Sequence, residues 1–293
     1  KKNNICIFQK QFFNYKSNIQ NFSGENFSHY KILKNVIEYK EKFNGNMSIH
    51  VKNENKGLDF ECLFEIEIRI SGDWTDHINK KNGMTSLDVK LSSGNIDGIT
   101  KFKLFAPIAR NYENEVFVTT FLEMIGFLSP RTSLVDVFMD DFNGKQIHRR
   151  KMIFQENSNR KEILERNNRR EGIIFEGDES LILAADPNSI EDRSFKTELE
   201  DISLSRVTNW KWLLKNNNSR LISTSAFIDL QDNFINWGMN LNSDQIPIDK
   251  NPFRYFFDPN KGKSEIFLNF QFLLTSMNGV HGLIPHNRKF HYN

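Results

Sequence analysis

The stretch HGLIPHNRKFHYN, residues 281–293, gathers side chains that can do acid–base and metal chemistry. Its three histidines, His281, His286 and His291, lie five residues apart. Zinc sites on helices favour an i, i+4 spacing and structural zinc sites usually add cysteine, so the spacing disfavours a three-histidine zinc site. A histidine with the ordinary pKa of about 6.5 suits proton abstraction from a hydroxyl, and we predict this role for His281. The alternative is that all three are surface or structural residues.

The two cysteines do not complete a metal site at these histidines. Cys6 and Cys62 form no CxxC pair, and both are far from residue 281 in the sequence. They are predicted either to be buried thiols or, in an exported protein, to form a disulfide. Without a known compartment the first alternative is favoured.

Composition excludes several classes of protein. The 293 residues suffice for one large domain or two modest ones, and 27 phenylalanines supply core volume although hydrophobic residues make up only 38%. The formal net charge is +2 and no concentrated basic stripe stands out, so we predict no nucleic-acid partner. No apolar run approaches the roughly 20 residues that cross a bilayer, which predicts no transmembrane segment. The N-terminal apolar stretch is too short for a signal peptide.

Hydrophobic periodicity predicts the elements that must position these side chains. Residues 62–70, 85–91 and 101–106 alternate apolar and polar side chains, the period of half-buried strands in an antiparallel meander. Apolar residues then recur at helical spacing from 113 to 127, and Gly126 and Pro130 are predicted to end that helix.

The rest of the chain predicts a change from strands to helices. Residues 132–154 are predicted to form a hairpin with Asn143-Gly144 at its turn, followed by a charged helix and a short strand. From about residue 195 the pattern is mainly helical. We therefore predict an α+β protein with an irregular N-terminal extension that contains one or two short strands (1–60), a sheet-rich lobe (61–190) and the start of a helical lobe (191–293).

Residues 102–145, FKLFAPIARNYENEVFVTTFLEMIGFLSPRTSLVDVFMDDFNGK, resemble the N-terminal lobe of the CotH family, the atypical spore-coat protein kinases. The shared features are a strand ending near an Arg and an Asn-rich turn, a helix closing on Gly, then Pro-Arg-Thr and an Asn-Gly turn. MIFQE and RREGIIFEGDE are similar to the segments that follow in that family. The resemblance covers roughly residues 62–293. It implies a kinase-like two-lobe fold and suggests an extracellular or cell-surface location.

The resemblance also implies ATP and Mg²⁺ as cofactors and a set of residues that bind the nucleotide. Lys90 would neutralise the phosphates, with Lys103 as its competitor. Glu113 would brace Lys90, because the predicted apolar face of its helix, centred between Phe117 and Phe121, leaves Glu115 far from the sheet. The ordinary alternatives are a solvent-facing lysine and a first-turn acid favoured by the helix dipole.

Two further residues of the predicted nucleotide site come from loops and strand ends. Arg110 would grip phosphate at the border of the cleft. Glu156, at the end of MIFQE, would contact the adenine or ribose. Their ordinary alternatives are a loop arginine and a glutamate that begins a solvated turn.

The catalytic segment of the family has an Asp five residues before an Asn. Asn287 matches that Asn and is predicted to bind Mg²⁺, although it can also be a simple turn residue. Gly282 stands where the Asp is expected, so the Asp is absent or replaced and His281 takes the position of the base. The family's next metal-binding motif, Asp-x-Asp, would fall after Asn293. The chain by itself is therefore predicted to be inactive.

Two hypotheses about function follow. The first is a CotH-like kinase that transfers the γ-phosphoryl group of ATP to a hydroxyl of a protein substrate. The second is a non-catalytic kinase-fold module, a pseudokinase that binds a surface partner, and the missing Asp before Asn287 favours it. A β-rich carbohydrate-binding protein fits the strands but not the helical second half.

Overall fold

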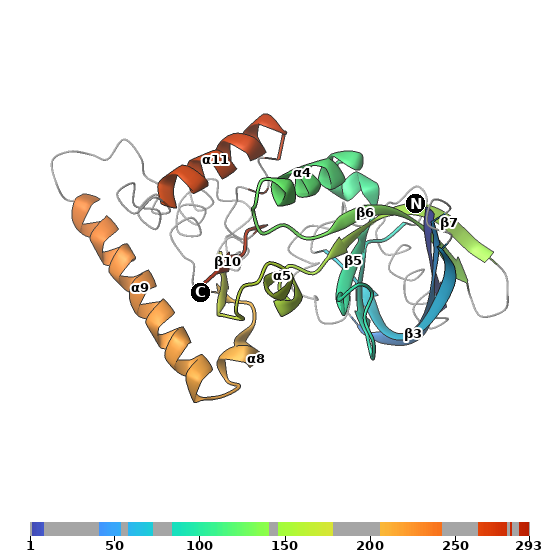
Figure 1. The fold of residues 1–293 in the computed structure, drawn as a ribbon, viewed down its shortest axis with the longest axis horizontal. Coiled ribbons are helices and arrows are strands. Elements are labelled where there is room, and N and C mark those ends of the chain that lie inside the picture. The colour runs from blue at the N-terminus through green and yellow to red at the C-terminus, as the bar shows by residue number, and fades with distance from the viewer. Residues whose placement is uncertain are drawn as a thin grey trace, which may run out of the picture. The chain divides into compact units, whose positions relative to one another are not determined.

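The computed structural model describes most of the chain in nine stretches. They are residues 2–8, 41–53, 58–72, 84–140, 146–177, 206–241, 263–279, 282 and 287–292. The chain divides into two compact units, Lys1–Ile163 and Leu164–Asn293; among the described residues the first is mainly strands and the second mainly helices (Figure 1). The fold class is therefore α+β, as predicted.

The first unit is built on a curled antiparallel sheet. Its strands, in spatial order, are β2 (Phe43–Asn53), β3 (Leu58–Ile70), β4 (Leu87–Leu91), β5 (Lys101–Phe105), β7 (Gln146–Glu156) and β6 (Thr132–Asp140). A further strand, β1 (Lys2–Phe8), pairs antiparallel with β2 and parallel with β6, which closes the sheet into a barrel. The N-terminal residues that the sequence predicted as an extension thus supply two of the barrel strands.

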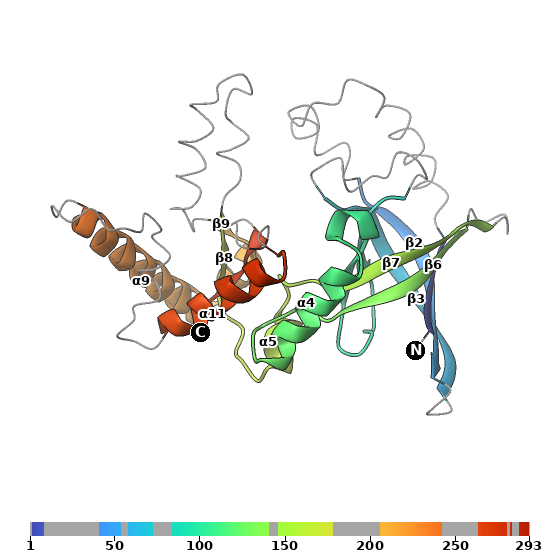
Figure 2. The same ribbon diagram turned by 90° about the horizontal axis from the view of Figure 1, so that it is seen from above.

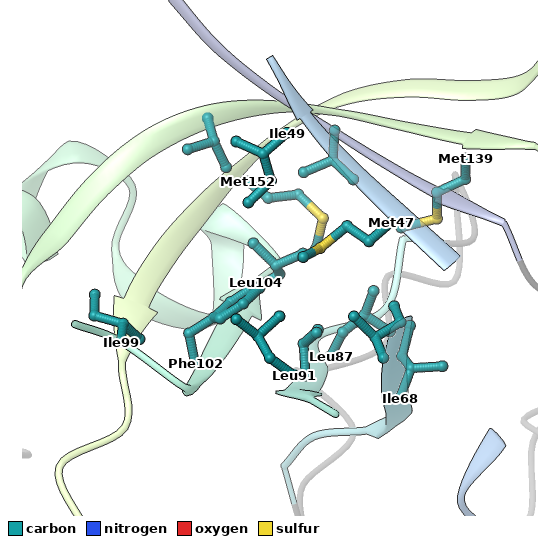
Figure 3. Packing of buried hydrophobic residues seen from close by; sticks show 14 of the residues in the cluster. Met47, Ile49, Ile68, Leu87, Leu91, Ile99, Phe102, Leu104, Met139 and Met152 are labelled. Carbon is teal, nitrogen blue, oxygen red and sulfur yellow. The ribbon is translucent and has the colours of Figure 1, made fainter. Parts of the chain in front are cut away.

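Alternation along the strands produces the barrel core. In β3, Ile66, Ile68 and Ile70 are buried while the charged residues between them are partly exposed, which confirms the predicted period of two. Met47 and Met152 are both fully buried in this core (Figure 3). Their unbranched thioether side chains adapt to the irregular space between the branched residues of the other strands.

One helix packs on the outside of this barrel. It is α4 (Glu113–Met124), which follows β5 in the sequence and contacts β6 (Figures 1 and 2). This confirms the predicted helix on a sheet containing residues 63–70, 87–91 and 132–138. As predicted, the chain leaves the helix at Gly126, whose φ of 89° is readily adopted only by glycine.

The predicted buried face of α4 was wrong. Val118, Thr119 and Leu122 are buried, whereas Phe117 is 59% exposed. These three residues therefore form the face of α4 that packs on the barrel. The Thr119 hydroxyl donates a hydrogen bond to the Glu115 carbonyl at 2.7 Å, so its burial leaves no unpaired polar group.

The second unit combines a small sheet with helices. Strand β8 (Ile174–Glu176) lies between β9 (Arg206–Val207) and β10 (Phe290–His291). The helices are α8 (Trp210–Leu213), α9 (Asn217–Leu241) and α11 (Lys263–Ser276), while α5 (Lys161–Arg166) spans the boundary between the units. None of the helices in the described stretches is long and apolar enough to cross a membrane. The boundary at Ile163 lies earlier than the predicted one near residue 190.

The two cysteines are kept apart by the barrel. Cys6 on β1 lies opposite Ser48, and Cys62 on β3 lies opposite Ile49, so strand β2 runs between them. Two strand spacings of about 4.8 Å separate their backbones by almost 10 Å, beyond the roughly 7 Å that a disulfide tolerates. The disulfide alternative does not fit this fold, and Cys62 is a free, partly buried thiol.

Candidate functional site

The outer surface of strands β3, β4 and β5 carries two adjoining rows of charged residues. The register places Arg69 opposite Asp88, and Asp88 opposite Lys103. In the second row Lys90 lies between Glu67 and Lys101. We call these six residues the β3–β5 outer face: Glu67, Arg69, Asp88, Lys90, Lys101 and Lys103.

Asp88 is the buried centre of this face. Arg69 donates two hydrogen bonds to Asp88 Oδ2, from Nε at 3.1 Å and from Nη2 at 2.6 Å, and Lys101 Nζ lies 3.2 Å from the same oxygen. Burial by itself raises the pKa of Asp88, but Lys101, Arg69 and Lys103 outweigh it and lower that pKa below the usual value. Asp88 is therefore an ionised carboxylate although it is only 4% exposed.

The two candidate phosphate lysines differ in their surroundings. Lys90, the predicted residue, is exposed on β4. Lys103, its competitor, is partly buried, and its Nζ lies 5.5 Å from the ring centroid of Phe105. Arg110, the predicted phosphate-binding arginine, lies in the short 3-10 helix η3 (Pro107–Arg110). Its guanidinium carbon is 4.3 Å from the same ring centroid. Lys103 and Arg110 are thus brought to one aromatic ring, and Lys90 is not among the contacts of that ring.

The acid that contacts the sheet from α4 is Glu115. Its Oε1 accepts a hydrogen bond from Gln155 Nε2 at 2.6 Å, and Gln155 lies opposite Lys103 in the strand register. Glu113, the predicted partner of Lys90, is exposed in the first turn. The expectation that Glu115 lies far from the sheet was wrong because Glu115 precedes the buried Val118 and Thr119 by three and four residues, on the same helix face.

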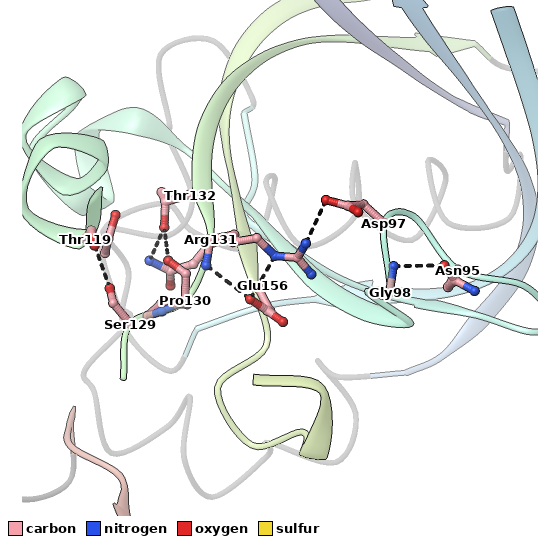
Figure 4. A network of polar contacts seen from close by, with 10 residues as sticks. Asn95, Asp97, Gly98, Thr119, Ser129, Pro130, Arg131, Thr132 and Glu156 are labelled. Carbon is pink, nitrogen blue, oxygen red and sulfur yellow. Dashed lines mark hydrogen bonds and ion pairs between the residues drawn. The ribbon is translucent and has the colours of Figure 1, made fainter. Parts of the chain in front are cut away.

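Glu156 is held in a structural network. It is 2% exposed, and its Oε2 accepts hydrogen bonds from the backbone N and from Nε of Arg131, at 3.2 and 3.3 Å (Figure 4). Arg131 Nη1 also donates to Asp97 Oδ2 at 2.8 Å (Figure 4). The network joins the end of β7, the residue before β6 and the loop between β4 and β5. These contacts give Glu156 a structural role, and the predicted contact with adenine or ribose stays a prediction.

The C-terminal segment is fixed within the second unit. Lys289 forms an ion pair with Glu176, Phe290 lies opposite Phe175 in the sheet, and the Tyr292 hydroxyl donates a hydrogen bond to Asp229. Asn287, just before these contacts, is exposed. His281, the predicted base, lies outside the described residues.

His291 is the histidine of this segment whose surroundings are described. Burial, followed by the charges of Arg169 and Lys289, lowers its pKa to about 4. It is therefore neutral near pH 7, and its Nδ1 is buried without a hydrogen-bond partner among the described residues. His291 belongs to the packing of the small sheet, which was one of its predicted alternatives.

The donors near Asn287 fit a magnesium ion only in part. Asn287 offers one amide oxygen, whereas the carboxylates that contact its segment, Glu176 and Asp229, are bonded to Lys289 and Tyr292. Nowhere in the described stretches do three His, Cys, Asp or Glu side chains gather as metal ligands. A Mg²⁺ ion at Asn287 would need phosphate oxygens and water for most of its six ligands.

Sequence similarity does not assign this site to a family. No family model matches the chain, and no curated protein matches it. Asp88 and Gln155 were not among the residues predicted from the sequence. Alternation in LDVKL places Asp88 outward with Lys90, but its cation partners come from other strands, and only the register brings them together.

Proposed function

We propose that this chain is a CotH-like kinase-fold protein that binds ATP with Mg²⁺ and transfers the γ-phosphoryl group to a protein hydroxyl. One observation carries the proposal: β5, the strand directly before α4, presents Lys103 beside the Gln155–Glu115 contact of that helix. In protein kinases the phosphate-binding lysine lies on the strand before a helix whose glutamate orients it. The order of strand, lysine, helix and glutamate is the same here.

Within this proposal Lys103 takes the place first predicted for Lys90. Lys103 is partly buried and shares the Phe105 ring with Arg110, so two cations are available on one side of the barrel. Two adjacent cations of this kind suit the clustered charges of a polyphosphate. Glu115 is the proposed orienting acid in place of Glu113.

The proposed roles in the second unit come from the resemblance. Asn287 is the proposed Mg²⁺ ligand and His281 the proposed base. Support for Asn287 is that it is exposed and that the residues directly after it are anchored by Lys289 and Phe290. A ligand residue on a fixed segment loses less freedom on binding.

A matched pair of variants tests the nucleotide site. Calorimetric titration with MgATP should show binding to the wild-type chain. Lys103→Ala should weaken binding at least tenfold, because phosphate contacts by a partly buried cation are only weakly screened. Lys90→Ala, the control on the neighbouring strand, should change it less than threefold. Equal effects would reject the choice of Lys103, and no binding to the wild-type chain would reject the function.

The second candidate function is a non-catalytic kinase-fold binding module. Gly282, at the position where the family has its Asp, supplies no carboxylate, and its carbonyl accepts a hydrogen bond from Arg288 Nε at 3.1 Å. That position therefore anchors the segment instead of supplying an acid–base group. Incubation of the full-length protein with γ-labelled ATP and acceptor proteins separates the two: bound ATP without transferred label supports the module, and labelled protein supports the kinase.

A further inference from the structure

We infer that Asp88 is a positioning residue of the proposed phosphate site: a carboxylate on the neighbouring strand fixes Arg69, Lys101 and Lys103 for a polyphosphate. The inference rests on the proposed function and deepens it. It adds a second acid to the arrangement in protein kinases, where the acid that orients the phosphate lysine comes from the helix.

The contacts of Asp88 are those of a residue that holds others in place. One of its oxygens, Oδ2, receives both Arg69 hydrogen bonds and the Lys101 ammonium, within 2.6 to 3.2 Å. It faces out of the barrel, since its neighbours Leu87 and Val89 belong to the core, and yet it is 4% exposed. Because Asp88 points out of the barrel, the side chains that cover it include Arg69 and Lys101, which bind it. The cations are less enclosed, with 35% of the Arg69 side chain and 26% of the Lys101 side chain exposed.

The charges of the β3–β5 outer face explain why a carboxylate is needed there. Three cations, Arg69, Lys101 and Lys103, surround Asp88, and all three act on its ionisation. Like charges a few ångströms apart repel each other. Glu67, the other acid of this face, forms an ion pair with Lys42 at 2.9 Å. Asp88 is thus the carboxylate that offsets the mutual repulsion of these three cations.

The two acids in the first turn of α4 are placed differently from Asp88. Glu113 is exposed, and Glu115 accepts its hydrogen bond from Gln155. Asp88 lies directly opposite Lys103 in the register of β4 and β5. Asp88 therefore flanks this lysine on the β4 side, while Glu115 approaches it from the β7 side through Gln155.

A fixed cation cluster has a measurable consequence for ligand choice. Cationic side chains that are held in place before binding favour the ligand with the most phosphate charge, because they need not reorganise to contact the phosphates. ATP should therefore bind better than AMP, and the preference should depend on Asp88. A general weakening of the fold would lower the affinity for both nucleotides alike.

The experiment measures the binding of ATP and of AMP, each with Mg²⁺, to the wild-type chain and to Asp88→Asn. The matched control is Glu67→Gln, which removes an acid from the neighbouring row of the β3–β5 outer face. We expect the wild-type chain to prefer ATP at least tenfold. Asp88→Asn should lose most of that preference with AMP affinity changed less than threefold. Glu67→Gln should retain it. Asp88→Glu, which restores the charge on a longer arm, should recover part of it.

The outcomes distinguish failure of the Asp88 role from failure of the proposed ATP-binding function. If the wild-type chain binds neither nucleotide, the proposed function fails and the inference with it. If the wild-type chain prefers ATP and Asp88→Asn prefers it equally, the function stands and the role of Asp88 is rejected. Should Asp88→Asn show no cooperative thermal unfolding, Asp88→Glu decides: an undiminished preference for ATP rejects the role, and a loss of threefold or more supports it.

Discussion

Asp88 in the barrel unit and Glu176 in the second unit are both buried carboxylates that bind an arginine and a lysine. Asp88 contacts Arg69 and Lys101, whereas Glu176 contacts Arg206, at 3.0 Å, and Lys289. Their scaffolds differ. The strands around Asp88 enclose a core of Ile, Leu, Val, Phe and Met side chains, while β8, β9 and β10 are two or three residues long.

The small sheet depends on polar contacts to a larger extent. Its buried cluster among the described residues is Ile173, Phe175 and Ala226, with partly buried side chains packed around it. The Asn209 side chain adds two hydrogen bonds, from the Ile174 backbone N at 2.9 Å and to the Gly172 carbonyl at 2.8 Å. The ion cluster around Asp88 lies on a large apolar scaffold that supports the strands without it, and we propose that this cluster binds a ligand. In the small sheet the same kind of cluster is part of what holds the strands together.

The largest effect should come from the apolar core of the barrel. Phe102 is fully buried and its ring lies 4.6 Å from that of Phe154. Phe102→Ala should lower the free energy of unfolding by about 3–5 kcal/mol, through lost transfer energy and the cavity left behind. Phe117→Ala, which truncates a ring that is 59% exposed, should cost less than about 1 kcal/mol. Urea denaturation measures both, and similar losses would contradict the assigned core.

Acid should weaken the second unit through His291. Its pKa is lowered to about 4 in the folded chain, against 6.5 for an ordinary histidine, so between these values the unfolded chain binds a proton that the folded chain does not. Stability is fully present above pH 6.5 and should fall by up to about 3 kcal/mol as the pH drops towards 4. Urea titrations at several pH values test this. His291→Gln should flatten that part of the profile, and an unchanged slope would contradict the buried neutral histidine.

Removing the acid of the small sheet should have the next largest effect. Glu176→Gln leaves Lys289 and Arg206 without their carboxylate, and we expect a loss of about 2–3 kcal/mol, because Arg206 is half exposed and returns to water. Hydrogen exchange should show the loss at the amides of β8 and β10. Asp97→Asn serves as the control. Asp97 is 89% exposed in its ion pair with Arg131, and the change should cost about 0–1 kcal/mol.

The smallest expected effect distinguishes the two acids at the start of α4. Glu115→Ala removes the hydrogen bond to Gln155 and should cost about 1 kcal/mol. Glu113→Ala, at an exposed first-turn position, should cost about 0.3–0.5 kcal/mol through the helix dipole. Thermal unfolding of the two variants, measured side by side, gives the order. The reverse order would restore Glu113 as the acid that faces the sheet.

Where the sequence was informative, the cause was a long, regular period. The isoleucines of β3, the helix α4 and the hairpin of β6 and β7 were predicted because several residues in a row obey one spacing and a glycine or proline ends it. Strands β9 and β10 are two residues long, which is too short to show the alternation of apolar and polar residues that predicts a strand. One or two short strands were expected within residues 1–60, but β1, KNNICIF, was not located because its asparagines disguise the alternation.

The site was harder to predict than the fold. The resemblance directed attention to lysines on strands and to acids at the start of α4, but the choice between Lys90 and Lys103 depends on what lies across the sheet. Asp88 acquires its partners from β3 and β5, and Glu115 acquires Gln155 from β7. Such pairings depend on strand register and on the rotation of one helix, which hydrophobic spacing does not determine.

The parallel pairing of β1 with β6 has a consequence for how the barrel forms. Asn4 lies beside Asp136, so this contact joins the first barrel strand in the sequence to the last but one, whereas every other neighbouring pair of the described strands is antiparallel. Closing so long a loop carries a larger entropic cost than forming the β2–β3 or β6–β7 hairpin. We therefore expect the hairpins to form first and the seam between β1 and β6 to close last. Until then β6 presents an unpaired edge, which makes the nascent chain most prone to aggregation at that stage.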